Sequence, residues 1–106
     1  MRPTNEVTAT IYQQLGGHRF SIMTGARDFM TSGPATLVFG LPSSITRDRI
    51  RRVAITLDPD DTYSMRFFRR DKGTGLPTKL VYETQGVYND MLASVFTRHT
   101  GLDTHL

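Results

Sequence analysis

The sequence contains no cysteine. A chain without thiols forms no disulfide bond and carries out no thiolate chemistry, which excludes cysteine nucleophiles and redox-active cysteine pairs. This composition agrees with a cytoplasmic location.

Long hydrophobic runs are also missing. No stretch is apolar enough to cross a bilayer, and the N-terminal segment MRPTNEVTAT lacks the apolar core of a signal peptide. We therefore expect neither a membrane anchor nor export, and predict a cytoplasmic protein.

Catalytic and metal-binding motifs are absent as well. The GTG of DKGTGLP lacks the spacing of a nucleotide-binding loop, and Asp58, Asp60 and Asp61 lack the glycine and distal glutamate of a calcium loop. His99 and His105, with Asp103 between them, could in principle hold a metal ion. The favoured interpretation is that His99 completes the apolar stripe of a helix or caps its last carbonyls. We predict a non-enzymatic protein without cofactor or metal.

The chain that remains has the size and composition of one small globular domain. Its 106 residues allow one modest core, and 38% hydrophobic and 22% charged residues are typical of such a protein. We predict a single domain over residues 1–106.

The clearest pattern is a β-hairpin in the stretch Arg52–Arg70. Val53, Ile55 and Leu57 alternate with more polar residues, and Tyr63, Met65 and Phe67 repeat the alternation after the turn-forming DPDD. If the apolar residues of both strands share one face, Leu57 lies opposite Tyr63, Ile55 opposite Met65 and Val53 opposite Phe67. The loop then covers residues 58–62.

Further elements precede and follow this hairpin. Helical spacing predicts helices over residues 4–15, with Thr4 or Asn5 as N-cap, and 86–101, the latter with an apolar stripe that includes Tyr88 and Met91. Alternation predicts strands over residues 18–24, 35–41 and 79–84, the last with Leu80 and Tyr82 facing inward. The fold class is therefore α+β: one antiparallel five-stranded meander sheet, with the N-terminal and C-terminal helices packed on one face.

The net charge of +3 comes from one part of the chain. Residues 45–72 contain eight basic and five acidic residues, so this segment supplies the whole excess. The uncovered sheet face is predicted to carry Arg52, Arg66, Phe68 and Arg70, with the arginines of the preceding linker beside it. The candidate binding residues are Arg47, Arg49, Arg51, Arg52, Arg66, Phe68, Arg70 and Lys72.

Three interpretations of this basic face remain open. Arginine binds phosphate and an exposed aromatic ring stacks with unpaired bases, which favours nucleic acid, either DNA or RNA. The same face could instead dock onto a host protein or a second copy of the chain, forming a homodimer, or it could be plain solvated surface.

The segments IYQQLGGHRFSIMTGARDF, DTYSMRFF and GVYNDMLASVFTRHTGL resemble a family of small accessory proteins of bacteriophages and other bacterial mobile elements. The resemblance covers nearly the whole chain and implies an intracellular accessory protein of a bacterial virus or plasmid. It supplies no catalytic residue. The arginine density of RDRIRR and RFFRR is where this chain departs from the pattern.

Overall fold

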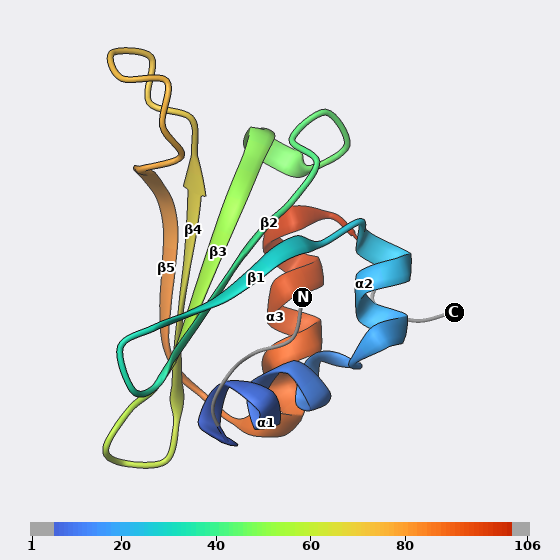
Figure 1. Cartoon of the computed structure of the whole chain (residues 1–106), viewed down its shortest axis with the longest axis vertical. Coiled ribbons are helices and arrows are strands. Elements are labelled where there is room, and N and C mark those ends of the chain that lie inside the picture. The colour runs from blue at the N-terminus through green and yellow to red at the C-terminus, as the bar shows by residue number, and fades with distance from the viewer. Residues whose placement is uncertain (1–5, 103–106) are drawn as a thin grey trace.

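A computed structural model describes residues 6–102 of the chain. Five strands form one antiparallel sheet in the order β1-β2-β3-β4-β5, and the three α-helices lie together on one side of it (Figure 1). The strands are β1 (Arg27–Ser32), β2 (Thr36–Gly40), β3 (Ile50–Leu57), β4 (Tyr63–Arg69) and β5 (Lys79–Val87). The helices are α1 (Glu6–Leu15), α2 (His18–Thr24) and α3 (Leu92–Thr100), with short 3-10 helices η1 (Arg47–Arg49) and η2 (Asn89–Met91). The predicted α+β meander is confirmed.

The central hairpin has the predicted register. Leu57 pairs with Tyr63, Ile55 with Met65 and Val53 with Phe67, and the amide of Asp58 donates to the carbonyl of Thr62 at 2.8 Å to close the loop. Neighbouring residues on a strand point to opposite faces. This register therefore buries the apolar residues of both strands on one face and leaves the alternating, more polar residues on the uncovered face.

The core lies between the buried sheet face and the helices. Ile11 and Leu15 of α1, Phe20 of α2 and Phe96 of α3 are buried against strand residues that include Phe39. The ring centroid of Phe20 lies 5.4 Å from that of Phe39 and 4.9 Å from that of Phe96, and both ring pairs have an edge-on geometry. One aromatic cluster thus joins the sheet to two of its helices.

The prediction of a strand over residues 18–24 is wrong, because this segment is helix α2. Phe20 and Thr24, four residues apart, are buried, whereas Ile22 is 68% exposed. That spacing belongs to a helix, and a seven-residue run that also alternates cannot be assigned from its own pattern. Gly25 ends α2 with φ +74°, and its amide donates to the carbonyl of Ser21.

The first strand lies instead in residues 27–32, between two predicted strands, where the sequence predicts none. β1 pairs with β2, but its register shifts between Arg27 and Met30, and Asp28 has φ +58°. This irregularity places Phe29 in the core and offsets the alternation by a residue. The bulge is the reason the strand was missed.

The C-terminal elements differ from prediction in three places. A register shift in β5 sets Leu80 opposite Phe68 on the uncovered face, so its predicted inward position is wrong. Gly86 and Val87 belong to β5 rather than to the last helix. Tyr88 and Met91 precede α3 and are 61% and 41% exposed, which leaves them outside the core. The proposed N-caps Thr4 and Asn5 lie outside the described residues.

Candidate nucleic-acid interface

The face of the sheet opposite the helices carries the predicted arginine and aromatic side chains. We call it the open face. Arg52 pairs with Phe68, and Ala54 pairs with Arg66, so these residues share that face across β3 and β4. The predicted interface requires that Arg52, Arg66 and Phe68 share one face of the sheet. The structure meets this requirement.

A shallow depression of about 440 Å³ lies in the middle of the open face. Its floor is formed by β2, β3 and β4, and Pro77 and Thr78 of the β4–β5 loop form part of its rim. Phe68 also lines this depression, and it is half-buried. The residues lining the depression are Ser32, Thr36, Val38, Arg52, Ala54, Thr56, Arg66, Phe68, Pro77 and Thr78.

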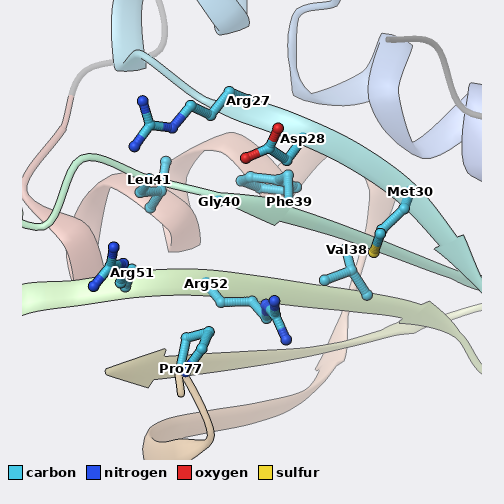
Figure 2. A pocket seen from close by; sticks show the side chains of 10 residues that line it. All are labelled: Arg27, Asp28, Met30, Val38, Phe39, Gly40, Leu41, Arg51, Arg52 and Pro77. Carbon is cyan, nitrogen blue, oxygen red and sulfur yellow. The ribbon is translucent and has the colours of Figure 1, made fainter. Parts of the chain in front are cut away.

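A second hollow adjoins it around Gly40 (Figure 2). Gly40 pairs with Arg27 on β1 and with Arg52 on β3, so two arginines flank a residue without a side chain. A Cβ added at Gly40 would lie 3.6 Å from the carbonyl oxygens of Arg27 and Arg51. The glycine keeps the floor between the arginines low. Arg27 was not among the predicted interface residues, since the bulge in β1 hid its position.

Five cations surround a third depression at one end of the sheet, with a volume of about 270 Å³. They come from the end of η1, the beginning of β3, the end of β4 and the β4–β5 loop, which the antiparallel pairing brings together. Ser43 of the β2–β3 connection completes the lining. We call these five residues the end cluster: Arg49, Arg51, Arg69, Arg70 and Lys72.

The structure thus divides the predicted interface residues into two groups. Arg52, Arg66 and Phe68 line the open face, whereas Arg49, Arg51, Arg70 and Lys72 belong to the end cluster. Arg70 lies beyond the end of β4 and does not line the open-face depression on which it was expected. Arg51 lines both the end depression and the hollow around Gly40, so it connects the two groups.

Arg69 joins the end cluster although the sequence interpretation omitted it. Alternation places Arg69 on the same side of β4 as the buried Phe67. It is nevertheless exposed, because it is the last residue of the strand. The doubled arginine of RFFRR was the only sequence signal.

Arg47 belongs to neither group. Its Nη1 donates to the carbonyl of Arg98 at 2.8 Å, on the helix-covered side of the molecule. A cation at this position satisfies a terminal carbonyl of α3 and interacts favourably with the helix dipole. Asp48 and Arg49 follow with φ +56° and +55°, a sharp local change of chain direction. Arg47 is therefore a helix-capping residue.

Among residues 6–102, no carboxylate forms an ion pair with a cation of the end cluster. Within residues 6–102 the structure contains one ion pair, Arg66 Nε to Glu83 Oε2 at 3.0 Å. The nearby carboxylates bind other groups: Asp48 accepts from the Tyr82 hydroxyl, and Asp71 accepts from the Gly73 amide at 2.7 Å. Several uncompensated cations around one depression create a positive potential that attracts anions.

His99 takes part in packing on the covered face. Its ring packs in tilted orientations against Tyr82 at 4.6 Å and Phe67 at 5.0 Å between centroids, and Nε2 lies 3.2 Å from the Thr84 hydroxyl. Burial, and then the positive charges of Arg98 and Arg47, lower the pKa of His99 below its ordinary value of 6.5. The described residues contain no group of three side chains that could ligate a metal.

A lowered His99 pKa predicts loss of stability at mildly acidic pH. The unfolded chain then binds a proton more readily than the folded chain, so this contribution is complete above about pH 6.5 and is lost as the pH falls below it. Urea unfolding of the wild type and of His99→Gln between about pH 5 and pH 8 measures this. The variant is expected to show a flatter profile across this range.

The matched control is His18→Gln, at an exposed position of α2. It should keep the wild-type pH profile. If His99→Gln retains the full loss of stability at acidic pH, the assignment to His99 is incorrect.

Fold and site together define an α+β protein with a five-stranded meander sheet, covered by helices on one face and lined by arginines on and beside the other. Comparison with protein-family models, curated proteins and solved structures finds no match. None of the helices in residues 6–102 has the length and apolar character needed to span a bilayer.

Proposed function

We propose that this chain is a non-enzymatic protein that binds single-stranded nucleic acid through the open face and the end cluster. The observation that carries the proposal is the end cluster: five cations without a carboxylate partner surround one depression, and Arg51 connects them to the open face. Arginine and lysine in this arrangement bind phosphate through charge-assisted hydrogen bonds.

The open face adds a surface on which a base can stack. Phe68 lies opposite Arg52 on one side and Leu80 on the other, and it lines the same depression as Pro77 and Thr78. Aromatic rings bind unpaired bases regardless of sequence, because every base has a π-face. Bases inside a duplex do not expose that face, so this arrangement favours a single strand.

One nucleic-acid strand could contact both the arginines and Phe68. Arg70 follows Phe68 by two residues, which corresponds to about 7 Å at the usual rise of an extended chain. Arg51 and Arg52 continue the positive charge from the end depression onto the open face. A strand could therefore place its backbone along the arginines while one base contacts Phe68.

The direct test is binding of a fluorescently labelled single-stranded oligonucleotide of mixed sequence, followed by anisotropy. Log affinity should fall linearly with log salt between about 50 mM and 200 mM, with a slope of about −3 to −4 if five phosphates are contacted. Affinity that does not change with salt contradicts the proposal.

Replacing Phe68 tests the stacking contact separately. Phe68→Leu should weaken binding about tenfold, since one base-stacking contact contributes roughly 1–3 kcal/mol. Phe68→Tyr keeps the ring and is expected to bind like the wild type. Both are compared in the anisotropy assay, with urea unfolding to verify the fold. Equal binding by both variants contradicts stacking on Phe68.

A second candidate function is docking of a protein on the same face. Met30 and Leu80 are 51% and 47% exposed there, and Leu76 of the β4–β5 loop is 57% exposed. Exposed apolar residues beside arginines are also typical of protein interfaces. Sedimentation at several concentrations tests for a homodimer. A pull-down from bacterial lysate, with and without nuclease, distinguishes a host protein from nucleic acid.

The origin implied by the resemblance to phage and mobile-element accessory proteins stays a prediction. The nucleic-acid and protein-docking functions are both of a kind that such a small accessory protein could perform.

A further inference from the structure

The end cluster differs in shape from the rest of the interface. On the open face, Arg27, Arg52 and Arg66 belong to three different strands and are spread over the sheet (Figure 2 shows the first two). In the end cluster, five cations converge on one depression of about 270 Å³. A convergent set of charges fits a ligand whose own charge is concentrated at one point.

We propose that the end cluster binds the terminal phosphate of a nucleic-acid strand, a group with more than one negative charge. This inference rests on the proposed function and names the part of the strand that the cluster recognises. An internal phosphate carries a single charge. A terminal phosphate carries about two, and its additional oxygens accept further hydrogen bonds from guanidinium groups. A diphosphate or triphosphate end, or a free nucleotide, offers the same chemistry.

The conformation around the cluster is held by contacts outside it. On the β3 side, the carboxylate of Asp48 accepts from the Tyr82 hydroxyl, and Arg47 donates to the end of α3. Arg49, which follows directly, has φ +55°, a left-handed conformation that is unfavourable for a non-glycine residue. The two anchors keep Arg49 at the depression without using its charge.

The β4–β5 loop is ordered in the same manner. The amide of Asp71 donates to the carbonyl of Leu76 and the amide of Gly75 donates to the carbonyl of Asp71, both at 2.7 Å. The carboxylate of Asp71 accepts from the amide of Gly73 instead of pairing with Arg70 or Lys72. The cations are thus held near one another before any ligand binds, which lowers the entropy cost of binding.

The experiment compares one oligonucleotide sequence with different ends. The wild type is titrated with the strand carrying a 5′-hydroxyl, a 5′-phosphate, a 5′-triphosphate or a 3′-phosphate, and with inorganic tripolyphosphate alone. A strand with a terminal phosphate at one of its ends is expected to bind at least about tenfold more tightly than the hydroxyl strand, one strong charge-assisted contact being worth that much. Tripolyphosphate is expected to compete with it.

Two single variants separate the cluster from the open face. Arg70→Ala should reduce the preference for the phosphorylated strand to less than about threefold, a partial loss of the charge-assisted contacts. Arg52→Ala, the matched control with the same change of charge, should weaken binding of all strands alike and leave the preference unchanged.

The outcomes separate this inference from the proposed function. Equal affinity for all four strands overturns the inference and leaves single-strand binding standing. If no strand binds but tripolyphosphate binds the wild type and not Arg70→Ala, the phosphate site is supported and the nucleic-acid function is refuted. Absence of binding by every probe overturns both.

Discussion

Replacing Phe39 with alanine is expected to lower the free energy of unfolding by about 4 kcal/mol, within the range measured for large-to-small changes in protein cores. Phe39 is fully buried in β2, and its ring centroid lies 5.4 Å from that of Phe20, 5.1 Å from that of Phe29 and 6.2 Å from that of Phe96. The truncation removes contacts to α2, β1 and α3 together. The cavity cannot close without moving three elements.

Urea unfolding monitored by circular dichroism measures this effect. Small domains are stable by about 5–15 kcal/mol, so Phe39→Ala should have a much lower midpoint or be largely unfolded. The matched control is Phe68→Ala, the same truncation at a half-buried position of the open face, which should cost less than half as much. If the two variants lose similar stability, the packing assigned to Phe39 is incorrect.

The double replacement Arg49→Ala with Arg70→Ala should lower affinity for a single-stranded oligonucleotide about 100-fold at low salt. Each charge-assisted hydrogen bond to phosphate contributes roughly 1.5 kcal/mol or more, so two together approach that factor. The salt slope should also become shallower by about 1.4, because each phosphate contact on a single strand contributes about 0.7. Anisotropy titrations at several salt concentrations measure both quantities.

The control for this variant is Arg19→Ala with Arg98→Ala, which changes the net charge equally on α2 and α3 of the covered face. Affinity and salt slope should then remain close to those of the wild type. The end-cluster variant should not lose stability, because neither of its two arginines forms an ion pair with any residue between 6 and 102. An equal loss of affinity in both double variants would show that only total charge matters.

The hairpin and its register could be predicted because the information is local. Val53, Ile55 and Leu57 alternate on one side of the DPDD turn, and slipping the opposing strand by one residue would move its apolar set to the other face. The same logic placed Arg52, Arg66 and Phe68 together on the uncovered face. This part of the candidate interface followed from alternation alone.

Helix α2 and strand β1 could not be predicted in the same way. In HRFSIMT both periods fit, and the helix is selected by contacts of Phe20 with Phe39 and Phe96, which are distant in sequence. In β1 the irregular register at Asp28 breaks the alternation that a strand assignment needs. Each error follows from a tertiary contact or a bulge that outweighed the local pattern.

The sequence by itself determined the central hairpin, the concentration of arginine in residues 45–72 and the chemical character of the open face. Only the tertiary structure decided which of these arginines lie together. Antiparallel pairing and the ordered β4–β5 loop gather five cations at one end of the sheet, while Arg47 is held at the carbonyl of Arg98, 51 residues away. The number of charged residues can be read from the sequence. Where their side chains lie in space depends on backbone turns and on partners distant in sequence, which local patterns do not contain.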